Sequence, residues 1–194
     1  MSEVTLLPAV ERAKVPWKNG GGVTQTVAAF PEDAGPDAFM WRVSIAEVRT
    51  AGPFSAFPET DRHLSILEGT LQLDVAGQSS TLSAASEGLA FRGDVAASGT
   101  PVDGPVLDLN VMTRRGRYRA EVERLRSEKF ARIDADIAIL VATAAIQVEL
   151  GENRMTLAPL DALRITDGQR LSIRADGPAY LIQIFSDDHA ADRN

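Results

Sequence analysis

An internal repeat is the feature that most constrains the fold of this chain. Segment 71–75, Leu-Gln-Leu-Asp-Val, aligns with segment 146–150, Ile-Gln-Val-Glu-Leu, 75 positions later. Further along, 104–112 aligns with 177–185 at an offset of 73. Because such short apolar-polar alternation is typical of strands, the repeat predicts a duplicated β unit, and two small indels account for the change of offset.

The chain between and around the repeats also has the pattern of short strands. Trp41, Val43 and Ile45 alternate with smaller or polar residues, which is the period of a strand with one packed face. Frequent Gly, Pro, Ser and Asp between such segments favour a sandwich or barrel over a βαβ fold. Strands are expected at 3–7, 23–30, 39–48, 80–83, 89–94, 106–112 and 118–122, and segment 61–75 is expected to form two short strands joined through Glu68-Gly69.

Charge and cysteine content exclude several classes of function. The chain has 20 basic and 27 acidic residues and a formal charge of -7, and its basic residues are scattered apart from 114–126. Nucleic acid and anionic membrane are therefore not expected partners. The absence of cysteine excludes disulfides, thiolate catalysis and thiolate metal sites.

The amino terminus gives no targeting signal. Residues 1–8 lack a positively charged region and a long apolar region, and no apolar run approaches roughly 18 residues. We therefore expect a cytoplasmic protein of the ordinary globular kind.

The most specific stretch is Pro16-Trp17-Lys18-Asn19-Gly20-Gly21-Gly22-Val23-Thr24. Its glycines allow positive φ and leave backbone amides accessible, so that these amides with Lys18 and Asn19 could converge on an anion. A phosphate-binding P-loop is not expected, because the lysine precedes the glycines and a strand follows them. The alternative is a tight turn between two strands with Trp17 packed beneath it.

Metal and hydrolase chemistry have little support. The chain has only two histidines, His63 and His189, so a site with three histidine ligands is impossible. No Gly-x-Ser-x-Gly motif is present. No metal or other cofactor is expected. The carboxylates Asp61, Glu68, Asp94 and Asp108 lie near expected turns or strand ends, which predicts that most are solvated.

Several motifs together resemble the HutD/Ves family of bicupins. They are WKNGGGVT at 17–24, WRVSIA at 41–46, GPFSAFP at 52–58 with DR at 61–62, LEG at 67–69, FRGD at 91–94 and DLNVMTRR at 108–115. The resemblance implies an all-β fold of two cupin-like barrels, or jelly rolls, with little helix. We expect the first barrel at 1–115 and a smaller second barrel at 116–194, and the N-terminal strands could be shared between them. A homodimer is expected by analogy with other cupin-like sheets.

The resemblance also implies a role in bacterial histidine utilisation and the binding of a small metabolite, with N-formylglutamate or a related carboxylate as the usual suggestion. It does not imply an established enzymatic activity. The alternative is a metal-independent enzyme, an amidohydrolase or isomerase, with His63 as acid-base.

Arginine and amide side chains suit such an anionic ligand. Arg42 and Arg62 can each hold a carboxylate through two parallel hydrogen bonds, and Asn110 offers both a donor and an acceptor. If the second face of 41–48 lies inside a barrel, Arg42 and Ser44 line a pocket; if not, they contact solvent. The predicted ligand-binding residues are Lys18, Asn19, Gly20, Gly21, Gly22, Thr24, Arg42, Ser44, Arg62, His63 and Asn110, ringed by Trp17, Phe57 and Met112.

Overall fold

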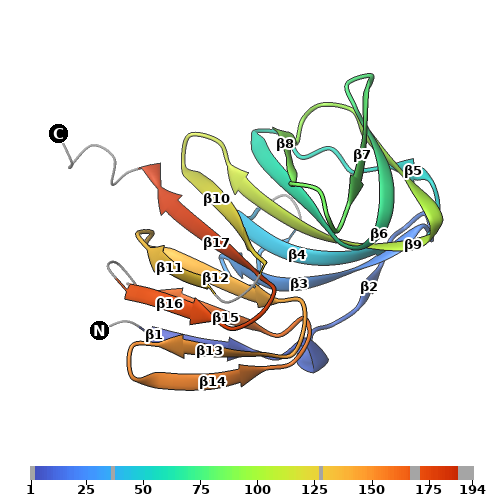
Figure 1. The fold of residues 1–194 in the computed structure, drawn as a ribbon. Coiled ribbons are helices and arrows are strands. Elements are labelled where there is room, and N and C mark those ends of the chain that lie inside the picture. The colour runs from blue at the N-terminus through green and yellow to red at the C-terminus, as the bar shows by residue number, and fades with distance from the viewer. Residues whose placement is uncertain (1–2, 36–37, 127–128, 167–170, 188–194) are drawn as a thin grey trace. The chain divides into compact units, whose positions relative to one another are not determined.

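The structure, a computed structural model, describes residues 3–35, 38–126, 129–166 and 171–187. These residues form seventeen strands and one short 3-10 helix, η1 (Ala9–Glu11). The chain divides into two compact units (Figure 1). The first unit spans 13–117, and the second combines 1–12 with 118–194. The all-β prediction is confirmed.

The first unit is one eight-stranded sheet that curls around its own core. Its central path runs in the order β2-β3-β4-β9-β6-β7, while β5 pairs with β9 and β8 pairs with β6. All of these pairs are antiparallel. The strands are β2 (Val15–Pro16), β3 (Gly22–Phe30), β4 (Trp41–Val48), β5 (Gly52–Pro53), β6 (Thr60–Val75), β7 (Gln78–Ser83), β8 (Leu89–Arg92) and β9 (Ala97–Arg114).

The second unit contains a five-stranded and a four-stranded sheet. The five-stranded sheet has the order β1-β15-β12-β17-β10, and the four-stranded sheet has the order β11-β16-β13-β14. Buried aliphatic side chains such as Leu140, Leu163 and Leu181 form its core. The strands are β1 (Glu3–Leu7), β10 (Tyr118–Leu125), β11 (Lys129–Ile133), β12 (Ile137–Ala142), β13 (Ile146–Leu150), β14 (Asn153–Leu157), β15 (Ala162–Thr166), β16 (Leu171–Ala175) and β17 (Ala179–Ser186).

The first strand of the chain belongs to the second unit. β1 pairs along its whole length with β15, and Leu6 lies opposite Leu163. The first twelve residues therefore join the C-terminal strands, whereas the sequence placed them in a barrel at 1–115 with possible sharing. A pairing between segments more than 150 positions apart leaves no local sequence signal.

The internal repeat corresponds to equivalent strand pairs in the two units. Leu71 of β6 pairs with Leu82 of β7, and Ile146 of β13 pairs with Leu157 of β14, so both partners are displaced by the same 75 positions. The later part of the repeat falls on β9 and β17, each of which lies between two other strands of its sheet. The predicted duplication is confirmed.

β6 is a single long strand, and the prediction of two strands joined by a turn at Glu68-Gly69 is wrong. The strand pairs with β9 from Thr60 to Val75, with irregular register around Glu68. Gly69 has φ +84°, and a Cβ there would lie 3.0 Å from the carbonyl oxygen of Pro105. The Glu-Gly pair therefore forms a β-bulge, which bends the strand without reversing it.

The core of the first unit defines which face of its sheet points inward. It contains Leu64, Ile66, Leu71 and Leu73 of β6, joined by Val106 of β9 and by residues of β4 and β7. Trp17, Phe54 and Phe91 pack against this core. Because side chains alternate along a strand, every residue in register with Leu64 or Ile66 shares this inner face.

No helix in the described part of the chain is long and apolar enough to cross a membrane.

Candidate functional site

Polar side chains from four strands meet on the inner face of the first unit. One row of direct strand partners runs from Thr26 through Ser44 and Asn110 to the core residue Leu64. Directly paired residues on neighbouring strands project to the same side of a sheet. The neighbouring rows are Arg42, Met112 and Arg62, and Thr24, Ala46, Asp108 and Ile66.

This register brings together five of the predicted site residues: Thr24, Arg42, Ser44, Arg62 and Asn110. Ser44 is buried and Arg42 is half-buried, so both lie on the inner face of β4 and not on a face open to solvent. Nη2 of Arg42 donates to Oγ1 of Thr26 at 2.9 Å. Burial lowers the pKa of Arg42 from its ordinary value.

Arg62 is the centre of this cluster. Its side chain is only 6% exposed, and its Nη2 donates to Oδ1 of Asn110 at 2.7 Å. Nη1 makes a long 3.4 Å contact to the carbonyl oxygen of Ser55, and Nε is buried without a partner in the part of the chain that the structure describes. A guanidinium so enclosed has lost its water and regains only part of its hydrogen bonding.

Three phenylalanine rings enclose the guanidinium, and we call them the aromatic cap: Phe54, Phe57 and Phe91. Their centroids lie 5.5, 5.7 and 5.1 Å from Cζ of Arg62. These distances fit cation–π contacts, which gain strength where water is excluded. Trp17 extends the aromatic surface, because its ring meets Phe54 edge-on at 6.2 Å.

Asp108 lies beneath Arg62 and Asn110 and was missed by the sequence reasoning. It was grouped with carboxylates near turns or strand ends, most of which were predicted to be solvated, and for Asp108 this placement is wrong: it lies inside β9 and is 1% exposed. Nδ2 of Asn110 donates to its Oδ1 at 2.7 Å, while its Oδ2 is buried without a partner among the described residues. The alternation of Asp108, Asn110 and Met112 within an apolar strand was the available signal.

Burial shifts the pKa values of both Asp108 and Arg62. Burial raises the pKa of Asp108 to about 7, although Arg62, the Asn110 amide and the Ala46 backbone favour its charged form. Burial also lowers the pKa of Arg62 to about 10, against the attraction of Asp108. Because burial disfavours the charged form of Asp108, this carboxyl is a weaker counter-charge for Arg62 than an exposed aspartate would be.

The triple-glycine motif forms a turn whose donors are used internally. The amide of Gly20 donates to the carbonyl of Trp17 at 3.0 Å, and the amide of Gly21 donates to Oδ1 of Asn19 at 2.9 Å. Gly20 has φ +70°, a conformation that favours glycine. Lys18 is exposed on this turn. These contacts support the turn reading and leave neither amide available for an anion.

Gly22 and Trp17 attach this turn to the sheet. A Cβ on Gly22 would lie 2.5 Å from the carbonyl oxygen of Glu47 and 3.0 Å from the Trp17 ring. Nε1 of Trp17 donates to Oγ1 of Thr24 at 2.7 Å, which holds the indole against the inner face. The motif therefore contributes Trp17 and Thr24 to the surroundings of the cluster.

His63 lies on the other face of β6. It directly follows Arg62 in a regular strand, so the two side chains point to opposite sides of the sheet. Its Nε2 lies 3.1 Å from Oγ of Ser65, and a Cβ on Gly88 would overlap that nitrogen. Burial lowers the pKa of His63, with Glu87 acting in the opposite direction. Within the described ranges no group of three or more His, Cys, Asp or Glu could hold a metal ion.

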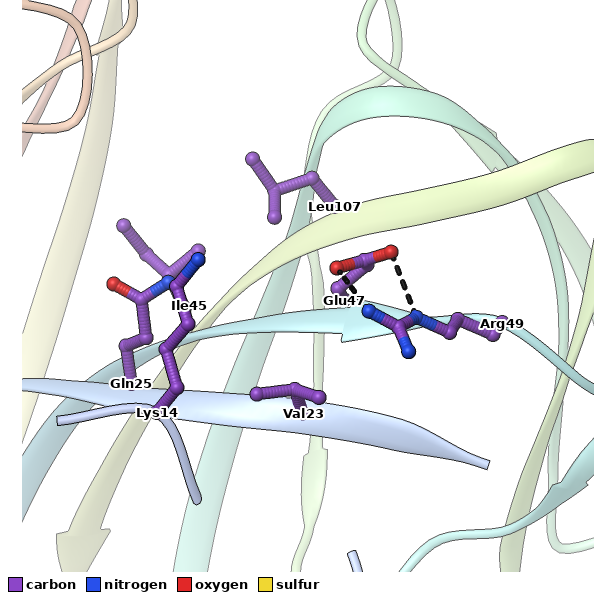
Figure 2. A pocket seen from close by; sticks show the side chains of 7 residues that line it. All are labelled: Lys14, Val23, Gln25, Ile45, Glu47, Arg49 and Leu107. Atoms are coloured by element: carbon purple, nitrogen blue, oxygen red, sulfur yellow. Dashed lines mark hydrogen bonds and ion pairs between the residues drawn. The ribbon is translucent and has the colours of Figure 1, made fainter. Parts of the chain in front are cut away.

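A surface pocket lies on the opposite face of β3, β4 and β9 (Figure 2). Arg49 donates to both carboxylate oxygens of Glu47, at 2.9 and 3.1 Å, and this contact lowers the pKa of Glu47. None of the predicted site residues lines this pocket. Its lining residues are Lys14, Val23, Gln25, Ile45, Glu47, Arg49 and Leu107.

Fold and site together define a two-barrel cupin with a buried arginine-amide-carboxylate cluster in its first unit, and cupin-like solved structures share this fold. A family model described as HutD matches residues 9–182. The chain belongs to the HutD family. This membership links it to the histidine-utilisation context that the resemblance implied.

Individual relatives agree with this assignment. An uncharacterized 21.2 kDa protein from the hutC 3′ region of Pseudomonas putida is 30% identical over 190 residues, covering 96% of this chain and 100% of that protein. Protein Ves of Citrobacter koseri is 37% identical over 108 residues, covering 55% of this chain and 56% of Ves. The structure of HutD from Pseudomonas fluorescens SBW25 (formate condition) matches with a TM-score of 0.83 at 27% identity, covering 95% of this chain and 99% of that one.

Proposed function

We propose that the first unit binds a small carboxylate metabolite of the N-formylglutamate type, without catalysing a reaction, and that this binding regulates histidine utilisation. The observation that carries the proposal is the buried guanidinium of Arg62, whose Nε has no partner among the described residues and whose neighbour Asp108 has a pKa raised by burial. A ligand carboxylate would supply the missing charge and an acceptor for Nε.

The placement of a second arginine supports an acid with two carboxylates. Arg42 and Arg62 are both direct strand partners of Met112, one on each side of β9. Two strand spacings separate their backbones by about 10 Å. Both side chains project to the inner face, so one could hold each end of a glutamate-sized dianion, with Met112 between them.

The aromatic cap supports binding in a dry site. Phe54 and Phe57 come from one segment, 54–57, whose Ser55 carbonyl lies at the long distance of 3.4 Å from Nη1 of Arg62. A contact of this length is weak, so a carboxylate can replace it. Because Arg62 is almost fully covered, entry of a ligand requires this segment to move.

The enzymatic alternative lacks support from the geometry. His63 was the candidate acid-base, and it lies on the face of β6 opposite to Arg62. A general base must come within hydrogen-bond reach of the group it deprotonates. For a ligand held by Arg62, His63 does not meet this requirement.

The test is isothermal titration of the purified, chelator-treated protein with N-formylglutamate, formate, glutamate and urocanate. Formate is included because the related Pseudomonas fluorescens HutD was solved in a formate condition. We expect saturable binding of one acid and its loss in Arg42→Ala. Arg132→Ala, which removes an exposed arginine of the second unit, is the control that should bind normally. No heat from any acid, with all proteins folded, would contradict the proposal.

A further inference from the structure

The four-stranded sheet β11-β16-β13-β14 of the second unit (Figure 1) has one face that points away from the hydrophobic core. Its core face carries the buried residues Ala131, Ile173 and Leu150. Because side chains alternate along a strand, the residues next to these lie on the opposite face. There, direct strand partners form a single line across the sheet, which we call the outer row: Phe130, Arg174, Glu149 and Arg154.

The outer row is exposed at both ends and charged between them. Phe130 is 68% exposed, and the Arg154 side chain is 78% exposed. Cζ of Arg174 lies 5.4 Å from the centroid of the Phe130 ring, and its Nη1 donates to Oε2 of Glu149 at 3.0 Å. Nη2 of Arg154 forms an ion pair with Oε1 of Glu149, also at 3.0 Å. Aromatic and arginine side chains of this kind are enriched at protein interfaces.

The outer row is complementary to itself in reverse order. A two-fold axis parallel to the strands, between β16 and β13, would turn a second copy so that its row runs in the opposite direction. Phe130 then faces the second copy's Arg154, and Arg174 faces the second copy's Glu149. Each contact occurs twice, as an isologous interface requires, and each joins a cation to an aromatic ring or to a carboxylate.

The charges beside the outer row also match under this axis. Arg132 lies two residues after Phe130 on the same face and is exposed, and Glu152 lies two residues before Arg154 in the exposed turn between β13 and β14. Since β11 and β14 run in opposite directions, both positions are at the same end of the sheet. The two-fold axis therefore brings Arg132 toward the second copy's Glu152.

We propose that the protein forms a homodimer through this face, with Phe130 and Arg154 as its principal contacts. Four strands of about five residues give a face of about 19 by 17 Å, or roughly 300 Å² per copy. This area is below that of a permanent interface, so the dimer is weak and depends on concentration. Packed sheets keep their strands within about 30° of each other, a twist that long arginine side chains can follow. The proposal concerns the second unit and does not depend on a ligand in the first.

Sedimentation velocity of the full-length protein, across about 5 to 500 μM, tests the proposal. We expect a shift from monomer to dimer with a Kd of about 10–100 μM. Raising NaCl from about 0.1 to 1 M should weaken the dimer several-fold, because salt screens the Arg174–Glu149 and Arg132–Glu152 pairs. A monomer at every concentration, or a dimer that salt strengthens, would overturn the proposal.

Exchanging the two ends of the outer row distinguishes this face from any other. Phe130→Arg sets guanidinium groups of the two copies against each other and should weaken the dimer at least about tenfold. Adding Arg154→Phe restores the complementary order, so the double variant should return to within about threefold of the wild-type Kd. Val10→Ser, which changes a 92% exposed residue of η1, is the control and should leave the Kd unchanged.

Circular dichroism verifies that each variant is folded. An unchanged Kd in Phe130→Arg, or a double variant as weak as the single one, would show that the copies do not meet through this face and would overturn the proposal. If Phe130→Arg does not fold, the double variant and the salt dependence of the wild type decide.

Discussion

Arg62 and Asn110 lie 48 positions apart in the chain and are joined by a 2.7 Å hydrogen bond inside the first unit. Neither residue is in register with the other: Arg62 pairs with Met112, and Asn110 pairs with Leu64, so the bond crosses diagonally between β6 and β9. This diagonal contact turns the arginine across the inner face, toward Asp108. The orientation of the proposed binding site depends on it.

Asn110→Ala should destabilise the protein by about 2–5 kcal/mol, because it leaves one more unpaired atom on each of Arg62 and Asp108. Chemical denaturation monitored by circular dichroism measures the change. Asn153→Ala, at an exposed position of the second unit, is the control and should stay within about 0.5 kcal/mol of the wild type. A similarly small effect at Asn110 would show that its two hydrogen bonds contribute little.

The pKa of Asp108, raised from 3.8 to about 7 by burial, predicts a specific pH dependence of stability. Between these two values the folded state binds a proton that the unfolded state has lost, so its stabilising contribution is present below about pH 4 and is lost as pH rises toward 7. The slope is about 1.4 kcal/mol per pH unit at most.

Asp108→Asn should remove this slope. The free energy of unfolding is measured for both proteins at several values between pH 4 and pH 8, and their difference is compared. Taking the difference cancels the opposite contribution of His63, whose lowered pKa makes stability rise with pH near its own titration. Parallel curves for the two proteins would show that Asp108 does not titrate in this range.

Gly22→Ala should destabilise the first unit by more than about 2 kcal/mol. A Cβ at this position would lie 2.5 Å from the backbone oxygen of Glu47 and 3.0 Å from the Trp17 ring, so the sheet or the indole must shift. Gly35→Ala is the matched control, since a Cβ there meets no atom within 4 Å. If the two variants unfold at the same temperature, Gly22 does not have the structural role assigned here.

His63→Ala should leave the affinity for N-formylglutamate within about tenfold of the wild type, because His63 faces away from Arg62. A catalytic role would instead cost roughly a hundredfold or more in rate. Titration calorimetry gives the affinity, and proton NMR of the ligand incubated with protein detects turnover. Ligand turnover that depends on His63 would favour the enzymatic alternative.

Local sequence pattern was sufficient for much of the fold. The alternation through β4 predicted a strand with Trp41, Val43 and Ile45 on one face, and this is confirmed. The repeat predicted a duplicated β unit, which the equivalent pairs Leu71–Leu82 and Ile146–Leu157 confirm. These features depend on periodicity, which short segments carry by themselves.

Features that depend on distant contacts were not predictable. Glu68-Gly69 has the composition of a turn, and only the continuous partner strand β9 shows that it is a bulge. Asp108 is a polar residue in an apolar strand, and its burial depends on Arg62 and Asn110 being brought to it by the sheet. Adjacent residues of a strand point to opposite faces, so the first of the two short strands expected within 61–75 already placed Arg62 and His63 on opposite sides, although both were predicted to bind the ligand.

The most direct test of Arg62 as the residue that holds the carboxylate is the affinity of N-formylglutamate for the wild-type protein and for Arg62→Met. Methionine keeps an unbranched apolar side chain against the aromatic cap while removing the charge and the donors. We predict saturable binding to the wild type and a loss of at least about a hundredfold in the variant, with a retained fold shown by circular dichroism. Equal affinity of the two proteins would contradict the claim that Arg62 holds the ligand.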